Sequence, residues 1–129
     1  MLLCIYFIYQ YNTPPRIKHT DVERIKNLIR GVAPEKVDSL EFYVDNESYT
    51  LNKKEVHLCI YNPEGELYPD NMLVYVALHE LAHALYQGDS SHHPDDYYQL
   101  FNSLLDRGEQ LGIYTRKIPV DRSYCMQAN

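Results

Sequence analysis

The 129-residue sequence lacks a hydrophobic run long enough to cross a membrane. Its most apolar stretch, residues 1–9, is much shorter than the ~20 residues that a membrane-spanning helix needs. No basic residue precedes this stretch and no small-residue cleavage site follows it, so it does not have the form of a signal peptide. We expect residues 1–15 to form a buried first β-strand. The alternative is the remnant of a longer anchor, with membrane contact through residues 1–11.

Cysteines are few, and none of them forms a CxxC pair. Cys4, Cys59 and Cys125 are odd in number and widely spaced. This pattern is typical of reduced thiols, and we therefore expect an intracellular protein, either cytoplasmic or nuclear. A disulfide between two of the three is the alternative.

An excess of positive charge is also absent. Twelve basic residues stand against eighteen acidic ones, for a net charge of −6 with neutral histidines. This balance excludes the broad basic surface typical of nucleic-acid-binding domains, so we expect no direct nucleic-acid binding. The sequence contains no repeat and no low-complexity segment, and its length suits one modest hydrophobic core. We therefore predict a single domain over residues 1–129.

Three amphipathic or apolar segments predict helices. A capping-box pattern at residues 20–23 and an apolar stripe behind it indicate a helix over residues 21–30. Residues 72–86 are apolar on nearly every side, which indicates a buried helix, with Asp70 or Asn71 as its N-cap and Gly88 just past its end. A third helix begins at Pro94, with His93 as its N-cap, and ends at Gly112.

Alternating apolar and polar residues predict three strands, at residues 40–44, 49–51 and 56–61. The turns between them are short, so we expect a small, mostly antiparallel meander. Residues 113–129 have no periodicity and should form an irregular tail over the core. Together these elements predict an α+β fold, in which a small sheet packs with an N-terminal, a buried central and a C-terminal helix.

The buried helix carries the sequence His79-Glu80-Leu-Ala-His83. Residues four apart lie on one face of a helix, about 6 Å apart along its axis, so both histidines can reach one metal ion. Ionisable groups in a buried helix are costly unless they are paired or bound to a metal. The His-Glu-x-x-His spacing predicts a zinc hydrolase site, in which zinc activates a water molecule and Glu80 acts as the general base.

Catalytic zinc usually has three protein ligands, so the motif needs one more. His93 follows a glycine-containing turn that can fold the chain back towards the metal. We rank it first, ahead of His92, with Asp89 and Glu109 as further alternatives. No residue stands out as an oxyanion donor, for which Tyr114 and Tyr124 are two of several candidates.

Residues 73–105 resemble the WLM and SprT-like metalloproteases. The resemblance lies in the motif, the loop after it, His93 and the aromatic Tyr97. In those families the motif reads HELxH, followed by a loop and His-x-x-x-aromatic. The resemblance implies a zincin-like fold, peptide-bond hydrolysis with Glu80 as the base, and a zinc site formed by His79, His83 and His93. For the best-known members it also implies cleavage of DNA-associated proteins.

The predicted partner is accordingly a protein or peptide substrate, and the sequence leaves the oligomeric state open. Extended substrate would pair with the strand at residues 56–61, as is common in zincins. Two alternatives remain. One is a catalytically inactive, zinc-stabilised protein-binding module. The other is a metal-free interaction protein in which His79 and His83 are hydrogen-bonded core residues.

Overall fold

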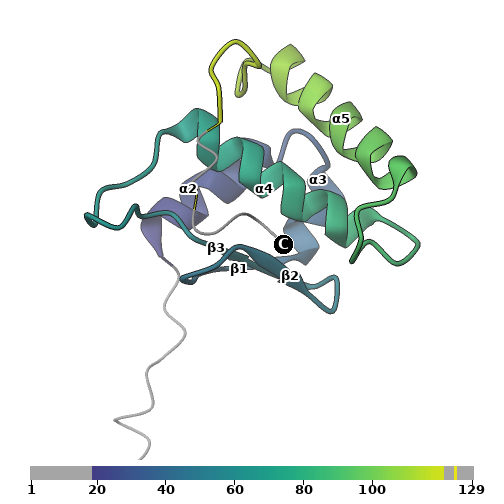
Figure 1. The fold of residues 1–129 in the computed structure, drawn as a ribbon, viewed down its shortest axis with the longest axis horizontal. Coiled ribbons are helices and arrows are strands. Elements are labelled where there is room, and N and C mark those ends of the chain that lie inside the picture. The colour runs from purple at the N-terminus through teal and green to yellow at the C-terminus, as the bar shows by residue number, and fades with distance from the viewer. Residues whose placement is uncertain (1–18, 121–123, 125–129) are drawn as a thin grey trace, which may run out of the picture.

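The computed structural model describes residues 19–120 and residue 124. Within this part of the chain, a three-stranded mixed sheet packs against four helices, which makes a small α+β fold (Figure 1). The helices are α2 (Thr20–Ile29), α3 (Pro34–Ser39), α4 (Asp70–Leu85) and α5 (Asp95–Gln110), and the strands are β1 (Glu41–Val44), β2 (Tyr49–Leu51) and β3 (Glu55–Leu58).

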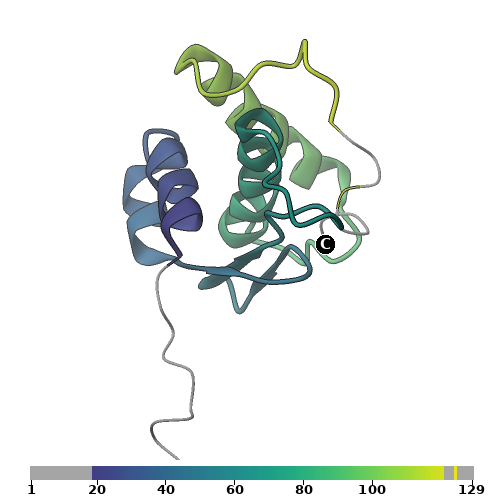
Figure 2. The same ribbon diagram turned by 90° about the vertical axis from the view of Figure 1, so that its left-hand side faces the viewer.

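Helix α4 lies at the centre of the fold. It contacts β2 and β3 on its sheet side, and it also contacts both α2 and α5. In Figure 2, α2 and α3 lie on one side of α4, and α5 lies on the other. This arrangement surrounds α4 with protein, which explains why nearly every residue in its sequence is apolar and confirms the predicted buried helix.

The prediction of an antiparallel meander is wrong. The strand order is β1-β3-β2, with β1 parallel and β2 antiparallel to β3. A tight turn joins β2 to β3, and Asn52 and Lys53 in this turn have positive φ angles of 53° and 57°. The hairpin therefore forms as expected, but β3 rather than β2 lies beside β1. Alternation of apolar residues is the same in parallel and antiparallel strands, so the pattern does not distinguish these orders.

The strand order also rules out β3 as the strand that pairs with substrate. Both edges of β3 are hydrogen-bonded within the sheet. Strand β2 is an edge strand among the described residues, and its side chains do not point as its sequence suggests. Thr50 faces α4, whereas Leu51 is exposed on the opposite face of the sheet.

Helix boundaries differ from the predictions by a residue or two. His19, rather than Thr20, caps α2, because its Nδ1 atom accepts a hydrogen bond from the backbone N–H of Asp21. The N-cap of α4 is Pro69, so neither Asp70 nor Asn71 has that role, and the N-cap of α5 is Pro94 rather than His93. Helix α3 was not predicted, since its six residues carry a single buried side chain, Val37.

The tail is irregular where the structure describes it. No helix or strand forms between residues 113 and 120. The side-chain amide of Asn71 binds this segment, accepting from the backbone N–H of Thr115 at 2.8 Å and donating to its carbonyl at 3.1 Å. Tyr114 is buried beside α5, so the tail covers one end of the core.

Two sequence predictions concern residues that lie partly outside the described chain. The predicted strand or anchor at residues 1–15 falls entirely outside it. Cys59 is disulfide-bonded, so the prediction of three reduced thiols is wrong and the disulfide alternative is the one observed. The expectation of an intracellular protein rested on those thiols and stays untested. No helix in the described part of the chain is long and apolar enough to span a membrane.

Candidate metal centre

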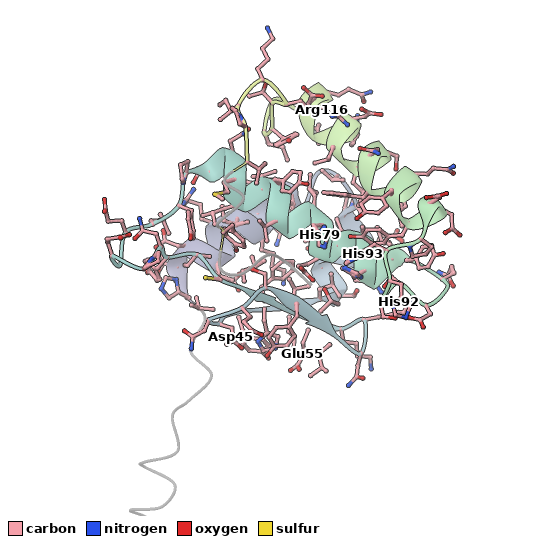
Figure 3. All side chains as sticks on the ribbon, in the orientation of Figure 1. Asp45, Glu55, His79, His92, His93 and Arg116 are labelled. Atoms are coloured by element: carbon pink, nitrogen blue, oxygen red, sulfur yellow. The ribbon has the colours of Figure 1, made fainter. Side chains whose placement is uncertain are left out.

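Three histidine side chains converge beside α4. The Nε2 atoms of His79 and His83 are 3.3 Å apart, as their spacing of one helical turn allows. The Nε2 atom of His93, from the loop before α5, lies 3.0 Å from that of His83. These three form the one group of potential metal ligands among the described residues. Figure 3 shows His93 beside His79, with His92 further out.

The spacing of the three nitrogen atoms fits a bound metal ion. Ligands held 2.0–2.1 Å from a tetrahedral zinc ion are roughly 3.3 Å from one another. Without an ion, the lone pairs of neutral imidazoles would face each other at this distance. A shared proton can relieve only one such contact at a time. The donor set therefore matches a metal site better than a hydrogen-bonded group of core histidines.

Burial keeps these histidines neutral, which is the state that binds metal. Burial lowers the pKa of His79 to about 3, and the proximity of His83 and His93 acts in the same direction. Burial likewise lowers the pKa of His83 to about 4. The pKa of His93 is also lowered, mainly by burial. No carboxylate contacts the three rings to favour their protonated forms, within the described residues.

Ser90 fixes the orientation of one ligand. Its Oγ atom is hydrogen-bonded to Nδ1 of His83 at 2.7 Å. When Nδ1 donates this bond, the lone pair of His83 lies on Nε2, which faces the other two histidines. Nothing in the sequence distinguishes Ser90 from its neighbour Ser91, so this contact depends on the path of the loop.

Tyr97 packs against all three ligands. Its ring centroid lies 5.7 Å from that of His79, 4.6 Å from that of His83 and 5.1 Å from that of His93. The side chain is fully buried, and its hydroxyl donates to the backbone carbonyl of His79 at 2.8 Å. The aromatic residue four positions after His93 thus holds the ligands in place, since it fills the space behind their rings.

His93 has an unusual backbone conformation. Its φ angle is +49°, in the left-handed region that residues other than glycine rarely adopt. Such a conformation costs of the order of 1 kcal/mol and is found most often at functional sites. It turns the loop before α5 so that the His93 ring reaches the two helix histidines.

The other predicted third ligands lie apart from this group. His92 is exposed and does not join the three converging rings. Asp89 is exposed, and its carboxylate accepts a hydrogen bond from the backbone N–H of Ser91. Glu109 lies near the far end of α5, where it binds Arg116. None of the three is available to replace His93.

The Glu80 side chain lies between α4 and strand β2, with no exposed surface. Burial raises the pKa of its carboxyl group well above the usual range, and a hydrogen bond from Thr50 opposes this shift. Thr50 Oγ1 lies 2.9 Å from Glu80 Oε1, while Glu80 Oε2 has no hydrogen-bond partner within residues 19–120 and 124. The sequence did not single out Thr50. Its one signal is a polar residue between two apolar ones in a strand.

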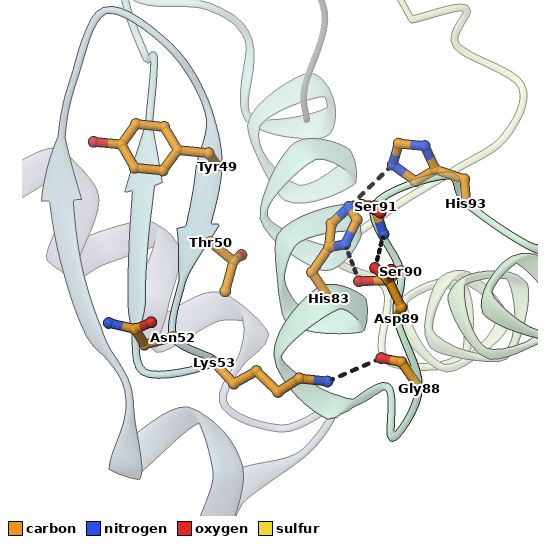
Figure 4. Close-up of a pocket in the computed structure, with 10 residues that line it drawn as sticks. All are labelled: Tyr49, Thr50, Asn52, Lys53, His83, Gly88, Asp89, Ser90, Ser91 and His93. Atoms are coloured by element: carbon orange, nitrogen blue, oxygen red, sulfur yellow. Dashed lines mark hydrogen bonds between the residues drawn. The ribbon is translucent and has the colours of Figure 1, made fainter.

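A cleft of about 440 Å³ opens beside the histidines, between β2 and the loop that follows α4 (Figure 4). Thr50 and Lys53 line one side, and Ser90 and His93 line the other. The Lys53 ammonium group crosses the cleft and donates to the carbonyls of Tyr86 and Gly88. The suggested oxyanion donors do not line this cleft. Tyr114 is buried beside α5, and the Tyr124 hydroxyl binds Ser48 and the Cys59 carbonyl.

Comparisons with known proteins relate the chain to two viral proteins. It is 39% identical over 89 residues to uncharacterized protein 042R of Invertebrate iridescent virus 3. The aligned residues make up 68% of this chain and 55% of that protein. The chain is 37% identical over 82 residues to uncharacterized protein 136R of Invertebrate iridescent virus 6, where the aligned residues make up 61% and 45%. The chain thus spans about half the length of the curated relatives it matches. No family model matches the sequence, and no solved structure matches it significantly.

Proposed function

We propose that this chain is a zinc metallopeptidase with a zincin-like site, similar to the WLM and SprT-like enzymes. One observation carries the proposal. The Nε2 atoms of His79, His83 and His93 lie close enough together to bind one metal ion, and Glu80 follows His79 on the same helix. Three neutral histidines with a neighbouring glutamate are the residues that a zinc hydrolase requires.

Zinc is the metal that this donor set favours. Three imidazole nitrogens and no carboxylate suit zinc better than magnesium or calcium, which prefer oxygen ligands. When bound, zinc polarises the scissile carbonyl and lowers the pKa of a water molecule to about 7. His79, His83 and His93 would hold the ion, and Ser90 would keep His83 in the tautomer that binds it.

Glu80 supplies the acid–base chemistry in this proposal. Its carboxylate takes a proton from the attacking water and returns it to the leaving amine as the peptide bond breaks. A carboxyl group with a raised pKa is well suited to carry that proton near neutral pH.

An extended segment of a protein or peptide is the proposed substrate. Strand β2 borders the cleft and offers a backbone edge, so substrate can add to the sheet beside the histidines. Cleavage of DNA-associated proteins rests on the family resemblance alone.

The Glu80→Gln variant tests this function. We expect it to keep one zinc ion per chain, measured by elemental analysis, because amide and carboxyl groups have the same shape. Cleavage of a fluorescently labelled, unfolded casein should fall by at least about a hundredfold, because the amide cannot accept the proton. Glu64→Gln, in the exposed turn before α4, is the matched control and should retain full activity.

One observation favours a second candidate, a zinc-stabilised binding module without turnover. Glu80 has no exposed surface, so the water molecule that attacks the peptide bond would have to reach it through the metal site. The same assay separates the two functions. Zinc binding without cleavage by the wild-type protein, or equal cleavage by wild type and Glu80→Gln, would remove the peptidase proposal.

A further inference from the structure

We propose that Thr50 is a positioning residue for Glu80, an inference that rests on the proposed function. Its hydroxyl holds one carboxylate oxygen, Oε1, so that the other oxygen, Oε2, is directed at the proton it must take. This assigns a role to β2 beyond its place at the edge of the cleft.

The hydrogen-bond geometry supports this role. Thr50 Oγ1 lies 2.9 Å from Glu80 Oε1 and 3.0 Å from the backbone carbonyl oxygen of Glu80. A hydroxyl has one proton to donate, and a carboxylate oxygen is the stronger acceptor of the two. The backbone carbonyl is already part of the hydrogen-bonding pattern of α4. The carboxylate is therefore the main acceptor of the Thr50 proton.

No other described residue shares this task. Glu80 is fully buried, and Thr50 is its one side-chain hydrogen-bond partner in the described part of the chain. The last torsion of a glutamate is broad, so a carboxylate without this bond would rotate between orientations. Because Oε2 lacks a partner among the residues that the structure describes, it is the oxygen left to receive a proton.

The position of Thr50 connects the cleft with the general base. Thr50 lines the cleft together with His83 and His93, as Figure 4 shows. Its side chain comes from β2, the strand whose edge would take the substrate. Substrate that adds to β2 therefore contacts the same strand that orients Glu80. Loss of the hydroxyl should lower the rate of the chemical step more than it weakens substrate binding.

The test compares Thr50→Val with Thr50→Ser in the zinc-loaded full chain, using labelled unfolded casein. Valine has the shape of threonine without the hydroxyl, so kcat should fall about tenfold with KM and zinc content unchanged. Serine keeps the hydroxyl and should restore most of the rate. Tyr43→Phe, which removes a hydroxyl from the uncovered face of the same sheet, is the control for a general effect on the sheet.

A double variant distinguishes positioning from a structural effect. In the Glu80→Gln background, Thr50→Val should cause no further loss of the residual rate, because the two residues act as one unit. A further tenfold loss there, wild-type kcat in Thr50→Val, or an equal loss in Thr50→Ser would overturn the inference alone. Zinc binding without any cleavage by the wild-type protein would overturn the proposed function together with it. Should Thr50→Val fail to fold, Thr50→Ala carries the same expectations.

Discussion

Two histidine environments on opposite sides of the sheet differ in the charges around them. On the face away from α4, the His57 ring stacks on Tyr49 at 4.4 Å and lies 5.2 Å from the ring of Tyr43. Its nitrogens are 3.1 Å from a carboxylate oxygen of Asp45 and 3.9 Å from one of Glu55. On the α4 side, His79, His83 and His93 also pack on an aromatic ring, but no carboxylate of the described residues lies among them.

The comparison separates a histidine beside carboxylates from three histidines that lie close enough together to bind a metal ion. The Asp45 carboxylate lies beside Nδ1 of His57, whereas the buried Nε2 atom has no hydrogen-bond partner among the described residues and lies 3.9 Å from an oxygen of Glu55. The Nε2 atoms of the three converging histidines face one another with no carboxylate beside them in the described part of the chain, an arrangement that a shared cation would satisfy. The aromatic packing is common to both places, so the absence of counter-charge, rather than the packing, indicates the metal site.

The largest change in zinc affinity that would test the contrast between His57 and the three converging histidines is expected from His93→Ala. Zinc affinity should fall by more than about a hundredfold, because one of the three proposed protein ligands is gone. Loss of a residue that only hydrogen-bonds to a ligand has a smaller effect, about ten- to a hundredfold. Competition with a chromophoric chelator measures this change. His92→Ala and His57→Ala are the controls and should bind zinc as the wild type does. The reverse order for His92 and His93 would break the assignment of the third ligand.

A smaller effect is expected from Ser90→Ala. The variant loses the hydrogen bond that holds Nδ1 of His83, so zinc affinity should fall about tenfold. Ser91→Ala changes the next residue, whose side chain is exposed, and should leave affinity unchanged. Equal zinc affinity in the two variants would show that the loop does not orient His83.

A further effect, about 1 kcal/mol for each histidine, is expected on the stability of the chelator-treated, metal-free protein. The pKa values of His79 and His83 are about 3 and about 4 in the folded chain, below the value of about 6.5 for unfolded histidine. The unfolded state therefore binds more protons below pH 6.5, and stability falls as the pH falls towards 4. Each histidine should contribute a loss of about 1 kcal/mol between pH 6.5 and 5.5.

Urea denaturation at the two pH values measures this loss. His83→Asn should reduce the difference between them, because one of the buried histidines whose pKa is lowered in the folded chain is gone. A metal-free protein with equal stability at both pH values would remove the distinction between the two histidine environments.

Much of the candidate site could be predicted because it is local in sequence. Helical periodicity alone places His79 and His83 on one face of α4 and makes that helix a buried one. His93 ranked ahead of His92 on the turn before it and on an expected N-cap position, but the N-cap is Pro94, so the resemblance to a known motif is the reason that still stands. The left-handed backbone that brings the His93 ring to the two helix histidines could not be predicted from the sequence.

The sequence by itself determined the α+β class, the central helix and the pair of histidines with its glutamate, because each depends on residues within a few turns of one another. Only the tertiary structure decided the strand order, the Ser90 contact and the hydrogen bond from Thr50 to Glu80. Thr50 and Glu80 are thirty positions apart in the chain. Alternation within a strand does not specify which neighbour it pairs with, and that pairing brings the Thr50 hydroxyl to the glutamate.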